Sequence, residues 1–169
     1  MKMNPWNVGG LVLATIAALV AAPCFANKER PKADLSEVRD RAESMPADLR
    51  RDTDKRIAIT VERVNQEARD RGQTTMTARL AAEFKVTEPS LLEDKAEYGL
   101  SWGELTMAHT LIANSPAGLA LVDLVQLRRE GLGWGAIAFG LQFHMGDFED
   151  MIKAEGRVAM GLSKSAAPK

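Results

Sequence analysis

The chain contains Gly-Leu-Ser-Trp-Gly-Glu-Leu at residues 99–105 and, 32 residues later, Gly-Leu-Gly-Trp-Gly-Ala-Ile at residues 131–137. The sequence has only three tryptophans, and two of them, Trp102 and Trp134, lie in this shared context. Chance is a poor explanation for such a match, so the pattern indicates an internal repeat.

Each copy predicts the joint of a helix-turn-helix unit, in which a glycine ends one helix at positive φ, the chain turns, and a tryptophan begins the next helix. The glycine after the tryptophan lets a neighbouring helix approach closely. The residues of this structural repeat are Gly99, Trp102, Gly103, Gly131, Trp134 and Gly135. We expect both tryptophans to be buried wedges. The alternative is an exposed platform on which a sugar or a base stacks.

Residues 73–160 are expected to form a compact body of about six short helices, because Gly, Pro and Ser break its apolar segments there. Ser101 followed by Glu104 is a capping box, which marks a helix start. Apolar residues of segment 80–91 recur with the same spacing in segment 137–148, which is a weaker echo of the repeat. We therefore expect the body to consist of about three imperfect helix-turn-helix units. The predicted helices are Met76–Lys85, Glu88–Tyr98, Trp102–Asn114, Pro116–Glu130, Trp134–Phe143 and Phe148–Val158.

Residues 27–72 form a charged arm with 12 Lys and Arg, 11 Asp and Glu, and no aromatic residue. Up to Pro46 we expect little stable structure, and beyond it one helix with a narrow apolar stripe. The stripe contains Ile57, Val61 and Val64, which are the candidate partner-binding residues. It can lie against the protein's own body, against an envelope partner, or against a second copy in a coiled coil. The sequence therefore predicts an all-α protein with a charged N-terminal helical arm and a compact helical body.

Residues 1–26 resemble a secretory signal peptide, with a charged start and an apolar run over residues 8–22. That run is shorter than the ~20 residues that span a bilayer as a helix, so we expect no stable membrane span after signal removal. Cys24 and Ala26 occupy the −3 and −1 positions of a cleavage site, which places the mature start at Asn27. The alternatives are an uncleaved anchor and lipid attachment at Cys24. The protein is thus expected in the periplasm or secreted.

The mature chain would carry 21 basic and 23 acidic residues and no cysteine. This composition excludes a disulfide and a thiolate nucleophile. Its near-neutral balance lacks the basic surface that nucleic-acid binding needs, so no nucleic-acid partner is expected despite the helix-turn-helix spacing. The body is followed by a tail, residues 161–169, that we expect to be disordered.

Few residues suggest catalysis or metal binding. The two histidines, His109 and His144, are 35 residues apart and match no zinc-binding spacing. Asp147, Glu149 and Asp150 lie near a predicted helix start, where acids are favoured by the helix dipole and where Asp147 is a candidate cap. Neither a phosphate-binding glycine loop nor a GxSxG serine is present. We therefore expect no catalytic residue, no metal and no cofactor.

Residues 131–141, followed by His-Met-Gly-Asp-Phe at residues 144–148, resemble the C-terminal segment of small exported bacterial proteins of unknown function that carry a GxGWGxIAxxLG pattern. The chain departs from the pattern at Gln142, where a glycine is usual. The resemblance covers about residues 99–155 and implies an exported helical protein without implying an activity. Residues 134–156 are also similar to the two-helix part of a LysM peptidoglycan-binding module, although the strands of that module are not evident.

These observations favour an exported, non-catalytic binding or interaction protein of the cell envelope, which contacts an unknown partner or a second copy through its N-terminal arm. The competing reading is a cell-wall glycan binder, either LysM-like or based on the tryptophan joints. A hydrolase with an unrecognised site is the third.

Overall fold

The computed structural model describes residues 34–116 and 118–162, and every regular element in these ranges is an α-helix. The all-α prediction is therefore confirmed. The predicted signal peptide and the tail from residue 163 onward lie outside the described residues. The helices are α1 (Leu35–Glu43), α2 (Ala47–Arg71), α3 (Gln73–Phe84), α4 (Glu88–Tyr98), α5 (Trp102–Asn114), α6 (Leu121–Arg129), α7 (Trp134–Gly140) and α8 (Met145–Ala159).

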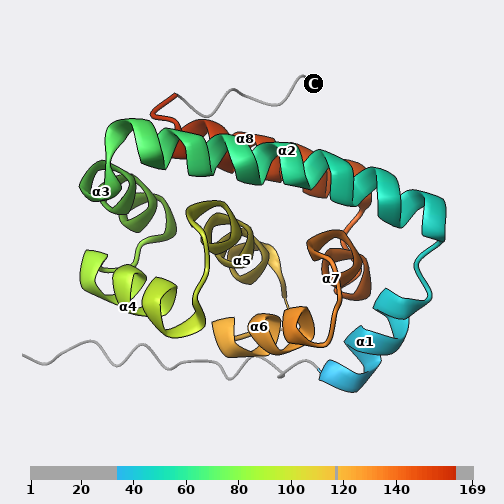
Figure 1. Cartoon of the computed structure of the whole chain (residues 1–169). Helices are drawn as coiled ribbons and strands as arrows, with labels where there is room; N and C mark the ends of the chain where they lie inside the picture. The colour runs from blue at the N-terminus through green and yellow to red at the C-terminus, as the bar shows by residue number, and fades with distance from the viewer. Residues whose placement is uncertain (1–33, 117, 163–169) are drawn as a thin grey trace, which may run out of the picture.

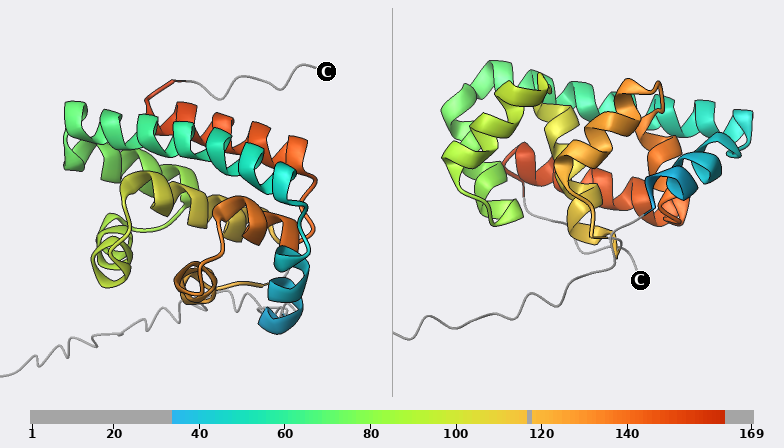
Figure 2. Two further views of the ribbon diagram at one scale, coloured as in Figure 1. Left: turned by 45° about the vertical axis from the view of Figure 1, so that its right-hand side comes forward. Right: turned by 90° about the horizontal axis from the view of Figure 1, so that it is seen from below.

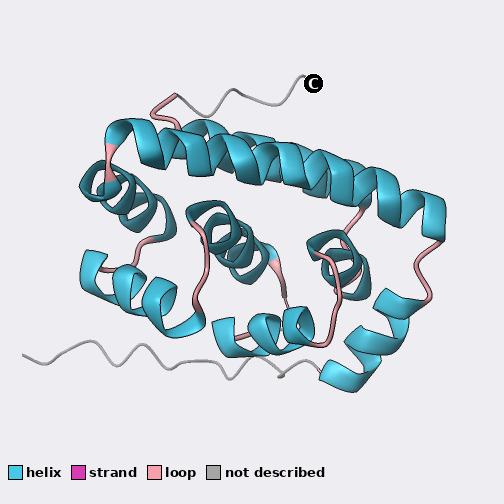
Figure 3. Ribbon diagram, viewed as in Figure 1, coloured by secondary structure: helices cyan, strands magenta, loops and turns pink. Residues whose placement is uncertain are grey.

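The described helices form three layers (Figure 1). The long helix α2 runs beside α8, and together they cover one face of a middle layer made by α3, α5 and α7. The helices α4, α6 and α1 lie on the other side of that middle layer, as the side view and the view from below show (Figure 2). Short loops join successive helices (Figure 3). Residues 34–72 are thus packed into the same core as the body.

The stripe on α2 faces inward. Ile57 is 4% exposed and Val64 is 1% exposed, and the partly buried Val61 packs against the same core. These three residues were predicted as a partner-binding surface, and the structure places Ile57 and Val64 in the core rather than on an open face of α2. The stripe looks narrow in the sequence because polar residues such as Thr53, which is fully buried, complete the inward face of α2.

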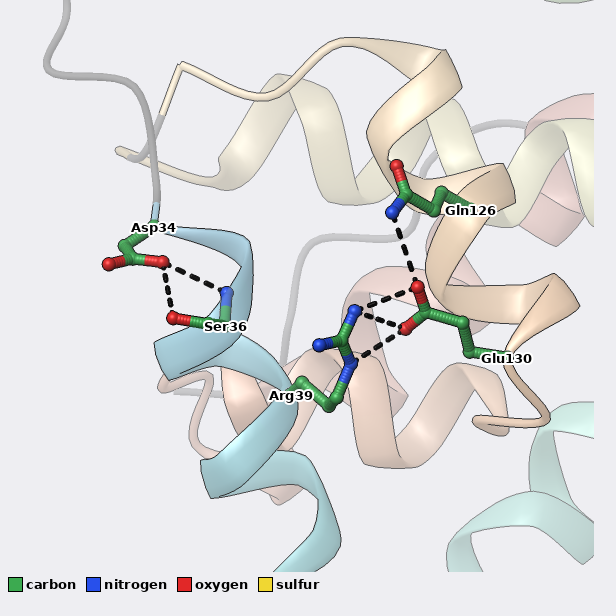
Figure 4. A network of polar contacts seen from close by, with 5 residues as sticks. All are labelled: Asp34, Ser36, Arg39, Gln126 and Glu130. Carbon is green, nitrogen blue, oxygen red and sulfur yellow. Dashed lines mark hydrogen bonds and ion pairs between the residues drawn. The ribbon is translucent and has the colours of Figure 1, made fainter.

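The segment before Pro46 was expected to lack stable structure, yet it forms α1, which packs on α7. Asp34 caps this helix, since its carboxylate accepts a hydrogen bond of 2.9 Å from the Ser36 amide (Figure 4). At the same helix, the Arg39 guanidinium donates two hydrogen bonds of 2.7 Å to Glu130, at the end of α6. Gln126 donates a further bond of 3.2 Å to Glu130. The hydrogen bonds from Arg39 lower the pKa of Glu130.

Three predicted helix starts differ from the structure. The helix α3 begins at Gln73 rather than at Met76. Pro116 was expected to begin a helix with Ser115 as its N-cap, and Ser115 does have an extended ψ of 131°, but α6 starts only at Leu121. Gly118, at φ 60°, then keeps the chain out of a right-handed helix. The last helix begins at Met145 rather than Phe148, with His144 at the N-cap, so Asp147 lies in the first turn and is not the cap.

The repeat is visible in the backbone. Gly99 and Gly131 have φ of 66° and 94°, and in both turns the following leucine amide bonds back to the carbonyl five residues earlier. The weaker echo has a counterpart too. Lys85 and Gln142, 57 residues apart, are both left-handed, at φ 57° and 65°, and each is followed by the same kind of five-residue hydrogen bond. The α7 helix therefore ends at Gly140, before the predicted Phe143.

Candidate functional site

The two repeat helices meet α2 in the same way. In α5, the amide of Gly103 donates a hydrogen bond of 2.8 Å to Asn65 Oδ1, and in α7 the amide of Gly135 donates one of 3.4 Å to Asp54 Oδ1. Each glycine is the second residue of its helix, where the backbone N–H has no partner within the helix. The charged helix α2 therefore supplies polar caps to the helices that it covers.

Both glycines are required for this close approach. A Cβ on Gly103 would lie 2.5 Å from the backbone oxygen of Val61, and a Cβ on Gly135 would lie 2.7 Å from the methyl group of Thr53. At Gly103 no larger residue fits without moving the backbone of α2, and at Gly135 the side chain of Thr53 would have to move. The prediction that these glycines admit a neighbouring helix is confirmed.

Trp102 and Trp134 are 7% and 5% exposed, so the predicted wedges are buried. A basic side chain from the preceding helix lies over each ring: Lys95 Nζ is 5.3 Å from the centroid at Trp102, and the Arg128 guanidinium is 5.1 Å from that at Trp134. With the rings buried and one face of each covered, neither tryptophan offers a free surface on which a sugar could stack.

A cleft of about 270 Å³ opens where α2 crosses the second repeat. It brings together two of the three stripe residues, Ile57 and Val61, with Trp134, while Val64 does not reach it. The cleft is lined by Asp54, Ile57, Ala58, Val61, Glu104, Arg128, Gly133 and Trp134. Three of these residues are charged, and they come from α2, α5 and α6.

Each charged group of the cleft is held in place by a structural hydrogen bond. Asp54 caps α7, as described above. Glu104 Oε2 accepts bonds from the amide and the hydroxyl of Ser101, at 3.0 and 2.9 Å, in the predicted capping box. Arg128 Nη1 donates a 2.8 Å bond to the Leu132 carbonyl, and its Nη2 lies 3.7 Å from Glu104 Oε1. The cleft therefore presents two carboxylates and one guanidinium in fixed positions.

Neither histidine belongs to a cluster of side chains that could bind a metal in the described part of the chain. His109 is buried and stacks on Phe84 with ring centroids 5.1 Å apart, whereas His144 is exposed and lies 3.6 Å from Asp147. Burial lowers the pKa of His109, and Asp94, at 3.6 Å from Nε2, opposes this effect only in part. Within residues 34–116 and 118–162, no group of three His, Cys, Asp or Glu side chains is arranged to hold a metal.

The acids at the start of α8 serve as ion-pair partners. Glu149 accepts a hydrogen bond of 2.8 Å from Arg56 and so joins α8 to α2. Asp150 lies 3.4 Å from Lys153, one turn further along the same helix. These contacts account for two of the three acids that the sequence analysis singled out.

Sequence reasoning identified Glu104 as a capping residue but missed Asp54 and Arg128 as members of a shared site. Neither has a local signal, because the cleft forms only when residues far apart in the chain fold together.

No helix in the described part of the chain combines the length and the apolar character needed to cross a membrane. Comparison with protein-family models, with curated proteins and with solved structures found no match. The class of the protein is therefore defined by its own features, namely a three-layer helical fold with a small charged cleft at the crossing of α2 and the second repeat.

Proposed function

We propose that this chain is an exported, non-catalytic binding protein of the cell envelope, and that it holds its partner at the cleft between α2 and the second repeat. The export half rests on the signal-peptide pattern of residues 1–26. The binding half rests on one observation: charged groups of both signs converge on an opening with an apolar wall formed by Ile57 and Val61. A few convergent polar groups on apolar walls are typical of ligand sites.

The geometry favours binding because the charged groups are fixed before a partner arrives. Asp54, Glu104 and Arg128 each already make a hydrogen bond to the protein, so little side-chain entropy is lost when they engage a ligand. The lining contains no Ser, Thr, Cys, Lys or His that could act as a nucleophile.

The size and charge of the cleft indicate which kind of ligand it can bind. About 270 Å³ accommodates a side chain or a small group of a larger partner rather than a drug-sized molecule. Two carboxylates against one guanidinium leave a surplus negative charge, which favours a partner segment that presents a basic side chain.

Glycan hydrolysis is a second candidate, because Asp54 and Glu104 are two carboxylates on one cleft, the residue pair that glycosidases use. It is less well supported, since both carboxylates already accept hydrogen bonds that cap helices, and Glu104 also lies 3.7 Å from Arg128.

Site-specific photocrosslinking in intact cells tests the proposal. A photoreactive residue at the exposed Ala58, on the cleft, should give a discrete adduct, whereas one at the exposed Ser90, on α4, should not. The double variant Asp54→Asn/Glu104→Gln keeps the capping oxygens but removes both charges, so it should lose the adduct and stay folded. The matched control is Asp52→Asn/Glu93→Gln, which removes two exposed carboxylates outside the cleft.

An adduct at Ala58 that persists in the Asp54→Asn/Glu104→Gln variant, or no adduct at all, would count against the cleft as the binding site. Release of soluble fragments from purified cell-wall glycan, abolished by Glu104→Gln, would instead establish the second candidate.

A further inference from the structure

A second concave surface follows the seam between α2 and α8 and shares no residue with the cleft described above. It has a volume of about 340 Å³. We call this surface the seam groove. It is lined by Thr60, Arg63, Lys153, Gly156, Arg157, Met160 and Leu162. The helices approach closely here because Gly156 has no side chain: a Cβ would lie 2.8 Å from the methyl group of Thr60.

The seam groove concentrates positive charge on a chain whose formal net charge is −1. Arg63, Lys153 and Arg157 all line it, and no carboxylate does. Glu67, which follows Arg63 by four residues on α2, is paired with Arg71 at 3.4 Å and with Arg79 at 3.0 Å.

Structural roles account for only part of this charge. Arg157 lies in the last turn of α8, where a basic side chain interacts favourably with the helix dipole. Lys153 pairs with Asp150. Arg63 is different, because it projects from the middle of α2, is exposed, and makes no ion pair with any described residue. Neither an ion pair nor the helix dipole therefore explains the presence of Arg63 in the groove.

The rest of the groove is apolar. Met160 is half-buried, and Leu162, at 49% exposure, is one of the few large apolar side chains that the described part of the chain leaves open to solvent. A small inorganic anion would use the cations and leave this wall unused. An anion that carries an apolar chain would use both.

We propose that the seam groove binds a phosphate ester that has a net negative charge and bears an apolar chain, with the phosphate among Arg63, Lys153 and Arg157 and the chain along Met160 and Leu162. A phosphate group suits this arrangement because its several oxygens can accept hydrogen bonds from cations on two helices at once, and guanidinium groups match its geometry. The ligand is either a membrane phospholipid or a soluble phosphorylated amphiphile, since both share this chemistry.

Calorimetric titration of the mature protein with dihexanoyl phosphatidylglycerol, which is monomeric in water, tests the proposal. We expect saturable binding that weakens as salt rises. Dihexanoyl phosphatidylcholine, which has the same chains but no net charge, should bind at least tenfold more weakly. Arg63→Gln/Lys153→Gln should weaken binding of phosphatidylglycerol at least tenfold. The matched control Lys55→Gln removes an exposed positive charge from α2 outside the groove, so it should change affinity less than twofold.

Three results of the titrations would overturn the proposal: equal affinity for both lipids, equal loss in Lys55→Gln and in the double variant, or binding of inorganic phosphate as tight as that of phosphatidylglycerol. Flotation with phosphatidylglycerol vesicles separates the two sources. Binding to vesicles as well as to the monomer assigns the groove to a membrane lipid, and binding to the monomer alone assigns it to a soluble amphiphile. Binding to vesicles alone would contradict a groove that holds a single molecule.

Discussion

Asp54 and Gly135 are 81 positions apart, and the carboxylate of the first accepts a hydrogen bond of 3.4 Å from the amide of the second. A helix N-terminus leaves its first amides without partners and carries a partial positive charge, so a carboxylate is a suitable cap. Asn65 does the same for Gly103 three turns further along α2. The polar residues of α2 therefore belong partly to the interior, which explains how so highly charged a helix packs closely on the middle layer.

The close contact at Gly103 predicts a steep cost for a single methyl group. Gly103→Ala should destabilise the protein by about 1–3 kcal/mol or more, although alanine is the better helix former, because its Cβ would meet the backbone of Val61 rather than a side chain that can turn away. The control is Gly146→Ala in the first turn of α8, where a Cβ would lie no closer than 3.4 Å to the exposed His144. Urea unfolding should show Gly146→Ala neutral or stabilised, and equal losses in both variants would contradict the packing argument.

The tryptophan wedges predict matched losses in the two repeats. Trp102→Ala and Trp134→Ala should each cost about 3–5 kcal/mol, because each ring fills a buried joint. In the native protein, acrylamide should quench indole fluorescence weakly, and quenching should become strong in urea. Ready quenching in the folded state would show that the rings are accessible after all.

The left-handed residues that end α3 and α7 offer a route to higher stability. Lys85 and Gln142 adopt φ of 57° and 65°, where a Cβ costs roughly 1 kcal/mol. Lys85→Gly and Gln142→Gly should each raise the free energy of unfolding by up to about 1 kcal/mol, and Lys85→Ala should not. A lower melting temperature for both glycine variants would refute this reasoning.

The buried imidazole of His109 predicts an acid-sensitive fold. Because burial lowers the pKa of His109, the unfolded chain binds a proton at a higher pH than the folded protein does. Its contribution to stability is therefore complete above the unfolded pKa near 6.5 and is lost as pH falls below that value. Urea unfolding between pH 5 and 8 should show this decline, and His109→Gln should flatten it. The control variant is His144→Gln, which replaces an exposed imidazole, and equal flattening by both variants would contradict the role of His109.

The sequence predicts some elements well and others poorly, for physical reasons. The bounds of α4 and α5 follow from local signals, namely Gly99 at positive φ and the capping box of Ser101 and Glu104. The position of α2 has no such signal. Its inward face includes buried Thr53 and the caps Asp54 and Asn65, so hydrophobic periodicity understates how much of the helix is covered.

The charged cleft illustrates the same limit for function. Only Glu104 carries a sequence motif. Asp54 and Arg128 reach the site because α2 crosses the second repeat at that point, and this crossing depends on Gly133 and Gly135, whose missing side chains leave room for Asp54 and Thr53. Local periodicity contains no information about which turns of two distant helices meet.

The inward orientation of the α2 stripe can be tested with two isoleucines that are neighbours on one helix. Ile57 is 4% exposed and Ile59 is 49% exposed. Ile57→Ala should cost about 2–5 kcal/mol, because it leaves a cavity between α2 and the helices beneath it, whereas Ile59→Ala should change stability by less than about 0.5 kcal/mol. For the same reason, removing residues 27–72 should leave the remaining chain unable to fold, since the deletion exposes the faces of α3, α5, α7 and α8 that α2 covers. Urea unfolding measures the first effect, and circular dichroism with sedimentation measures the second. If Ile57→Ala proves as mild as Ile59→Ala and the shortened chain still unfolds cooperatively, the stripe does not form part of the core, and its role as a partner surface is restored.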